Sequence, residues 1–162
     1  MGLETPTLLG VPQVLLSADA LSRLFGRLRR TLGDDAEAVL FAAGYDRGEA
    51  EFAFVQTAYH PANPEEVAEY FGRYFRGLGH FNAQSVSLDA AAVKVIVHAD
   101  RSFEASDREA RDSGCGCAYL RGLTAGYFAA ALGTPMDAEE LRCESRGSPS
   151  CEIVATARSS PA

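Results

Sequence analysis

The chain contains no tryptophan, a single lysine at Lys94 and no long apolar segment. Arginine, aspartate or glutamate interrupts each apolar run before it reaches the length of a membrane span, so the sequence predicts no membrane-spanning helix. Basic residues number 15 against 22 acidic ones, a formal net charge of −7. Because nucleic-acid binding draws most of its affinity from basic groups that contact phosphates, this balance argues against direct nucleic-acid binding.

The N-terminus also lacks the basic region with which a secretory signal begins, and it carries Glu4 there instead. We therefore expect a cytoplasmic protein. In such a reducing compartment the four cysteines are expected to be free thiols or metal ligands and not disulfides.

A chain of 162 residues is long enough for one buried core and short for two. Pro6 and Pro12 interrupt any regular period near the N-terminus, and the last residues read ARSSPA. We therefore expect a flexible lead-in at 1–16, a single domain over 17–156 and a tail at 157–162.

Two helices are expected first. Ser17 is a typical N-cap for the first, in which apolar residues recur at three- and four-residue spacing until Gly33 ends it. Asp34 and the residue after it begin the second. Gly44 and Gly48 interrupt its pattern, which predicts a kink or a division into two helices.

Asn63 and Pro64 predict the start of a third helix, which extends to about residue 78. β-branched residues then alternate over 85–88 and 93–98, which is typical of a β-hairpin. One face of the third helix carries an aromatic stripe: Tyr70, Phe71, Tyr74 and Phe75.

Ser102 is expected to cap a polar helix to about residue 111, and a helix rich in small residues follows over 118–132. Small residues let such a helix pack closely against a neighbour. A second hairpin is expected from 140–144 and 151–155. The predicted fold class is therefore α+β, with an antiparallel sheet of two hairpins packed against several helices.

One group of residues has the chemistry of a metal site: Cys117, Glu140, Cys143 and Cys151. Thiolates suit zinc, and a carboxylate can complete its tetrahedron. The second hairpin can bring Cys143 and Cys151 together, and Cys117 begins the helix that could dock beside them. Residues three apart in a strand point to opposite faces, so the use of Glu140 requires a bend at Leu141.

Other interpretations of these residues remain open. Two cysteines that face each other across a hairpin also occur as a buried thiol pair or as a disulfide. Glu140 could be a solvated residue of an edge strand, and Cys115 could replace it as a fourth ligand. We favour Glu140, because Cys115 and Cys117 can reach one ion together only through a tight turn at Gly116.

Aromatic residues and histidines could line an apolar pocket between the helices and the sheet, in which His80 or His98 would hold a ligand hydroxyl or carbonyl. The same side chains could instead fill a core. The predicted pocket residues are Tyr70, Tyr74, Phe75, His80, His98, Phe103, Tyr119 and Tyr127. The sequence has no G-x-S-x-G motif and no phosphate-binding glycine motif, so it supports no catalytic assignment.

The spacing of the cysteines carries a resemblance. The run from Cys117 through the glycine-containing helix, the E-x-x-C motif at 140–143 and the last cysteine at Cys151 resemble the 4-vinyl reductase domain. They are especially similar to the N-terminal sensory domain of bacterial activators of phenol and toluene catabolism. The segments 102–105 and 40–48 resemble that domain more weakly.

The resemblance implies that Cys117, Glu140, Cys143 and Cys151 bind a structural zinc ion, so that the expected fold is zinc-stapled. It also implies a domain that binds or senses a small hydrophobic or aromatic ligand and regulates through a protein partner or through a homodimer. The pocket tryptophan of that family has no counterpart, which places phenol itself in doubt as the ligand. Two alternatives are an accessory protein or reductase in chlorophyll vinyl-group reduction, and an assembly protein, since the expected fold resembles TRAPP subunits.

Overall fold

The computed structural model describes residues 7–8, 11–12, 16–106 and 116–159. These residues form four α-helices, a four-stranded antiparallel sheet and a two-stranded pairing of β1 (Thr7–Leu8) with β2 (Val11–Pro12). The α+β class predicted from the sequence is confirmed. Among the described residues, no helix has both the length and the apolar character that a membrane crossing requires.

The four-stranded sheet has the order β3-β4-β6-β5. The strands are β3 (Asn82–Asp89), β4 (Lys94–Asp100), β5 (Met136–Arg142) and β6 (Cys151–Ala157). Both predicted hairpins are present, and the second begins earlier than expected, at Met136. The central strands β4 and β6 join the hairpins, with Val97 opposite Ile153.

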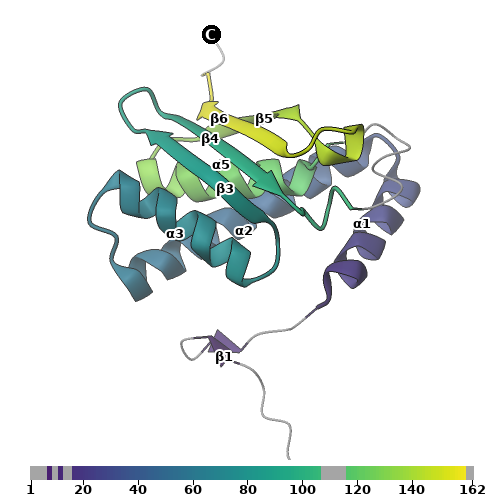
Figure 1. Ribbon diagram of the computed structural model, residues 1–162, viewed down its shortest axis with the longest axis horizontal. Coiled ribbons are helices and arrows are strands. Elements are labelled where there is room, and N and C mark those ends of the chain that lie inside the picture. The colour runs from purple at the N-terminus through teal and green to yellow at the C-terminus, as the bar shows by residue number, and fades with distance from the viewer. Residues whose placement is uncertain (1–6, 9–10, 13–15, 107–115, 160–162) are drawn as a thin grey trace, which may run out of the picture.

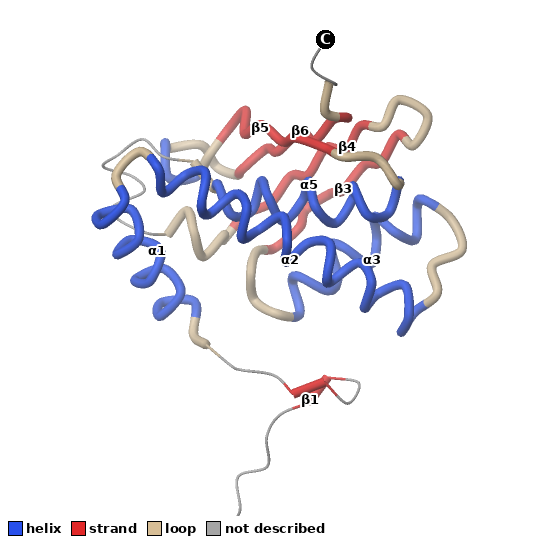
Figure 2. The backbone as a smooth tube through the Cα atoms, turned by 180° about the vertical axis from the view of Figure 1, so that it is seen from behind, coloured by secondary structure: helices blue, strands red, loops and turns tan. Residues whose placement is uncertain are grey.

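One face of this sheet carries the core. In β4, Val95, Val97 and Ala99 are buried, whereas the residues between them are more exposed. Figure 1 shows the helices gathered on one side of the sheet. Of the helices that the structure describes, none covers the other face in either the ribbon or the tube view (Figure 2).

Two helices contact the helix-covered face directly. The helix α3 (Pro64–Gly77) packs on β3, and α5 (Ala118–Leu132) packs on β5 and β6. Asn63 caps α3 by accepting a hydrogen bond from the backbone N–H of Glu66, as its sequence predicts. The helix α1 (Ala18–Leu32), capped by Ser17, lies at the end of the molecule near the start of α2 (Figure 2).

The long helix α2 (Asp35–Tyr59) packs on α5 from the side away from the sheet. It is one continuous helix, so the predicted division at Gly44 and Gly48 is wrong, while the alternative of a kink stays a prediction. Those glycines serve the helix–helix contact, because a Cβ at Gly44 would clash with the carbonyl oxygen of Tyr119 in α5. Gly126 of α5 lies in the same way against the carbonyl oxygen of Tyr45. The expected close packing of the small-residue helix is therefore confirmed.

The helix predicted from Ser102 to about residue 111 is described only in its first residues. Residues 103–106 form a turn, in which the N–H of Ser106 donates to the carbonyl of Ser102. The remainder lies outside the described residues. The turn packs against α1, since the hydroxyl of Ser22 donates to the carbonyl oxygen of Phe103 at 2.6 Å.

Candidate functional site

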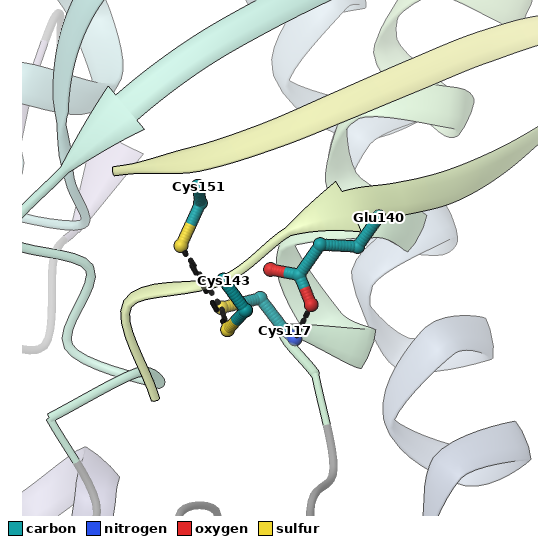
Figure 3. Close-up of side chains that lie close together, drawn as sticks. All are labelled: Cys117, Glu140, Cys143 and Cys151. Atoms are coloured by element: carbon teal, nitrogen blue, oxygen red, sulfur yellow. Dashed lines mark hydrogen bonds between the residues drawn. The ribbon is translucent and has the colours of Figure 1, made fainter. Parts of the chain in front are cut away.

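The four predicted metal ligands come together at one end of the sheet (Figure 3). Cys117 is the residue before α5, Cys151 is the first residue of β6, and Cys143 follows β5. The pairing of β5 with β6 is irregular between Glu140 and Arg142, which places a bulge at Leu141. The bend that the use of Glu140 requires is therefore present.

The three sulfur atoms form a nearly equilateral triangle. Cys117 Sγ lies 3.8 Å from Cys143 Sγ and 3.8 Å from Cys151 Sγ, and the latter two are 3.9 Å apart. These separations are far longer than a disulfide bond of about 2.05 Å. In a tetrahedral site with metal–sulfur bonds of about 2.3 Å, neighbouring sulfurs are about 3.8 Å apart. The triangle therefore has the dimensions of one face of a tetrahedral zinc site.

Glu140 offers the fourth ligand atom. Its Oε2 accepts hydrogen bonds from the backbone N–H of Cys117 and from Arg146, each at 3.0 Å. Its Oε1 is buried and has no hydrogen-bond partner among the described residues. The four ligand atoms lie within 4.8 Å of one another. An unpartnered carboxylate oxygen beside three thiols fits a metal ligand, because buried polar atoms are otherwise nearly always paired.

Polar groups surround the sulfur atoms. Ser145 Oγ is 2.9 Å from Cys143 Sγ, and the Cys117 thiol donates to Ser102 Oγ at 3.8 Å. The backbone N–H of Glu144 donates to Cys151 Sγ at 3.5 Å. Ser145 and the Glu144 N–H favour the thiolate form of Cys143 and Cys151, which is the form that binds metal.

The electrostatics of the cluster also favour a cation. Hydrogen bonds with Cys143 and Cys151, followed by burial, raise the pKa of the Cys117 thiol well above its usual value. Burial, followed by the nearby Cys143, raises the pKa of Glu140 to about 7. The four groups therefore resist ionising together unless a positive charge compensates them, and a divalent cation would supply that charge. Cys115, the alternative ligand, lies outside the described residues.

The predicted pocket residues do not form one group. Phe75 and Tyr127 are fully buried, and their rings, 6.2 Å apart, belong to the main core together with Phe71 and Phe128. Tyr70 and Tyr74 line a surface groove of about 180 Å³ with Tyr59 and Arg73.

Three of the predicted pocket residues contact the ring of a fourth, His80. His80 lies 5.6 Å from Phe75, 5.6 Å from Phe103 and 6.2 Å from Tyr119, measured between ring centroids. We call these four residues the His80 cluster. Burial, followed by the charge of Arg47, lowers the pKa of His80 to about 4, so its ring is neutral at pH 7.

His98 is not part of this arrangement. It alternates along β4 with the buried Val97 and Ala99 and pairs with Glu152 of β6. Its side chain therefore belongs to the sheet face opposite the core, and the prediction that it lines an internal pocket with His80 is wrong.

Sequence reasoning missed a buried polar group beside the His80 cluster. Glu51 of α2 is only 6% exposed, forms an ion pair with Arg47 and accepts a hydrogen bond from the hydroxyl of Tyr74. The available signal was the four-residue spacing of Arg47 and Glu51 on the same side of α2 as Gly44 and Gly48. That spacing is also typical of solvated helix faces, so it did not distinguish a buried pair from an exposed one.

No family model matches the chain, and no curated protein matches it. The fold does match solved structures. One is the phenol-responsive sensory domain of the transcription activator PoxR with phenol, at a TM-score of 0.74 and 22% identity, covering 90% of this chain and 77% of that one. Another is subunit 3 of the trafficking protein particle complex (TRAPP) from Naegleria fowleri, covalently bound to palmitic acid. That match has a TM-score of 0.65 and 14% identity and covers 88% of this chain and 95% of that one.

At these identities the two likenesses concern the fold. They confirm the expected resemblance to the sensory domains of aromatic-catabolism activators and to TRAPP subunits. The assignment to the 4-vinyl reductase domain has no family model behind it and stays a prediction.

Proposed function

We propose that this chain is a zinc-stapled domain that binds a small hydrophobic or aromatic molecule and regulates a partner protein or a second copy of itself. The observation that carries the proposal is the Nδ1 atom of His80, which is buried and has no hydrogen-bond partner among the described residues. It lies among the rings of Phe75, Phe103 and Tyr119. A polar atom surrounded by aromatic rings suits a ligand with an apolar body and one polar group.

The zinc ion would be structural. Cys117, Glu140, Cys143 and Cys151 would hold it, and it would join the β5–β6 hairpin to the start of α5. Four protein ligands complete a tetrahedral shell, so the ion would stabilise the fold and would not activate water.

The rings around His80 also offer a route by which binding could reach another part of the molecule. Phe25 of α1 lies 5.3 Å from Phe103 and 5.2 Å from Tyr119. A ligand that contacts His80 would displace these two rings and change how α1 packs. Its effect is limited by the difference in its affinity for the two packings. The likeness of the fold to a phenol-responsive sensory domain supports this interpretation.

Thermal unfolding in the presence of candidate ligands tests the proposal. The panel contains phenol, p-cresol, toluene and palmitate, and zinc content is measured on the same preparation. We expect at least one aromatic compound to raise the melting temperature, and His80→Phe to reduce that shift. His98→Gln is the matched control, because His98 lies on the opposite face of the sheet. Unchanged melting with every compound would contradict the proposal.

A second candidate is an assembly protein. The likeness to a TRAPP subunit and the close packing of Phe71, Phe75 and Tyr127 favour it. Analytical ultracentrifugation distinguishes the two candidates. An assembly protein would form a stable oligomer whose association does not respond to small molecules, whereas the sensor would change its association or its affinity for a partner when ligand binds.

A further inference from the structure

The four-stranded sheet has two edge strands, β3 and β5, which differ in how well they are protected. The edge at β5 is guarded, because Asp137 and Glu139 are exposed on it and the strand has a bulge at Leu141. Arg158 also donates hydrogen bonds to the Asp137 carboxylate and to the carbonyl oxygen of Met136. Charges, bulges and covered backbone groups of this kind keep an edge strand from pairing with another chain.

The edge at β3 has no such protection over residues 85–88. Their sequence, Ser-Val-Ser-Leu, carries no charge, and Ser85 and Ser87 are exposed. Among the described residues, only those of β4 hydrogen-bond to the backbone of this stretch. The N–H and C=O groups on its outer side are therefore available to another strand.

A groove of about 300 Å³ lies between this edge and α3. Figure 1 shows β3 at the near edge of the sheet with α3 alongside it. Four charged side chains of α3 line the groove: Glu65, Glu69, Arg73 and Arg76. An added strand would therefore meet free backbone groups and, next to them, a charged groove for its side chains.

The helix α3 runs along β3 in the opposite direction. Arg76, near the end of the helix, donates to the carbonyl oxygen of Ala83 near the start of the strand. Gly72, one turn earlier in α3, lies against the middle of the strand, since a Cβ there would be 3.5 Å from Val86 Cγ2. The acidic half of the groove wall precedes Gly72 and the basic half follows it, so the sign of the charge changes beside Val86.

This charge pattern is complementary to itself. A two-fold axis perpendicular to the sheet would pair two copies of β3 antiparallel and would also set their α3 helices antiparallel, on the same side of the sheet. With the axis at Val86, the acidic half of each α3 would lie toward the basic half of the other. The exposed ion pair of Glu69 with Arg73 within one helix is weak and leaves both groups accessible to such a neighbour.

We propose that β3 pairs antiparallel with β3 of a second copy of this chain, which joins the two sheets into one continuous sheet. Residues that face each other in such a sheet lie on the same side of it, so the axis passes through a residue. With the axis at Val86, Ser85 lies opposite Ser87 of the second copy. In naming the second copy that binding would regulate, the inference rests on the proposed function, but the pairing itself needs no ligand.

Sedimentation velocity of the zinc-loaded protein without ligand tests this pairing. Wild type is expected to form a dimer across a concentration series. Ser85→Lys/Ser87→Lys sets lysines directly opposite one another across the axis and is expected to weaken the dimer at least about tenfold. Thr156→Lys is the control, because Thr156 is an exposed residue of the central strand β6 and lies away from the β3 edge. Urea denaturation checks that each variant is folded.

A second pair of variants tests the charges. Glu69→Arg/Arg73→Glu keeps the net charge and an i,i+4 ion pair within α3 but sets like charges toward each other across the axis, and it is expected to weaken the dimer at low salt. Asp19→Arg/Arg23→Asp is the matched control, because it reverses an exposed i,i+4 pair on α1 in the same way.

The outcomes separate this inference from the proposed function. A wild type that stays monomeric, or a dimer that the folded Ser85→Lys/Ser87→Lys variant retains, overturns the pairing, whatever the ligand panel shows. Loss of the dimer in Thr156→Lys alone would assign the contact to the uncovered face of the sheet and would also overturn it. A dimer that depends on the β3 edge supports the pairing even if no compound changes the melting temperature, in which case only the proposed function fails.

Discussion

The guanidinium of Arg29 lies 2.7 Å from the carboxylate of Glu104, and their side chains are only 8% and 1% exposed. The same carboxylate accepts hydrogen bonds from the backbone N–H groups of Tyr119 and Leu120, at 3.2 and 3.1 Å. Glu104 therefore satisfies free N–H groups in the first turn of α5 and joins that helix to α1. This one buried pair therefore links two regions: the segment that carries the metal ligand Cys117, and α1 with its aromatic contacts.

Breaking this pair is expected to destabilise the protein strongly. Arg29→Met leaves a buried carboxylate without its cation, so the free energy of unfolding should fall by about 3 kcal/mol, measured by urea denaturation. Arg23→Met removes a fully solvated ion pair on the same helix and should cost less than about 1 kcal/mol. Equal effects of the two substitutions would contradict a structural role for the buried pair.

The contact between α2 and α5 predicts a contrast between two glycines. Gly48→Ala should cost more than about 2 kcal/mol, because the added methyl group would clash with the backbone of Leu123 and Tyr127. Gly77→Ala introduces a methyl group with nothing within 4 Å and should be neutral or slightly stabilising. Chemical denaturation of both variants checks this. A Gly48→Ala protein as stable as wild type would show that the helices can separate at low cost.

Elemental analysis of reduced, untagged protein should find about one zinc ion per chain. Cys143→Ser should abolish the bound zinc and lower the melting temperature, because a structural zinc site contributes on the order of 10 kcal/mol to folding. Cys115→Ser serves as the matched control and should retain the ion. Loss of zinc from Cys115→Ser together with retention in Glu140→Gln would assign the fourth ligand to Cys115.

The buried His80 predicts acid sensitivity. Its pKa is lowered to about 4 in the folded protein from 6.5, first by burial and second by Arg47, the charged group beside it, while Tyr119 packs on the same ring as a neutral phenol. The unfolded chain therefore binds the proton more readily between these values. Its contribution to stability is present above pH 6.5 and is lost as the pH falls toward 4, by up to about 3 kcal/mol.

Unfolding free energies measured between pH 4 and 7 test this dependence. His80→Phe should flatten the part of the curve below pH 6.5, whereas His98→Gln should leave it unchanged, since His98 belongs to the outer face of the sheet. Identical pH curves for wild type and His80→Phe would show that His80 is not protected in the folded state.

Local sequence signals determined much of this fold. Ser17 and Asn63 cap their helices, and the β-branched alternation of 93–98 places one face of β4 in the core, because these features depend on neighbours a few residues apart. The spacing of Cys117, Glu140, Cys143 and Cys151 was equally informative. Cys143 and Cys151 belong to one hairpin, and Glu140 joins them because β5 has a bulge at Leu141.

Other features depended on contacts between distant segments. Helix propensity by itself predicts a break in α2 at its glycines. Only the close approach of α5 shows that these glycines permit a continuous helix. His80 and His98 have the same side chain and lie in similar apolar contexts. The loop before β3 directs one into a ring cluster, whereas the strand period of β4 directs the other outward.

The sequence by itself determined most of the elements, the two hairpins and the residues able to bind a metal, since propensity, capping and donor chemistry are properties of short segments. Tertiary structure decided which charges are buried. Arg47 and Glu51 form an i,i+4 pair like Arg23 and Asp19, but only the first pair contains a buried charge, the carboxylate of Glu51. The physical reason is that burial depends on what packs against a helix face, and that neighbour comes from a distant part of the chain.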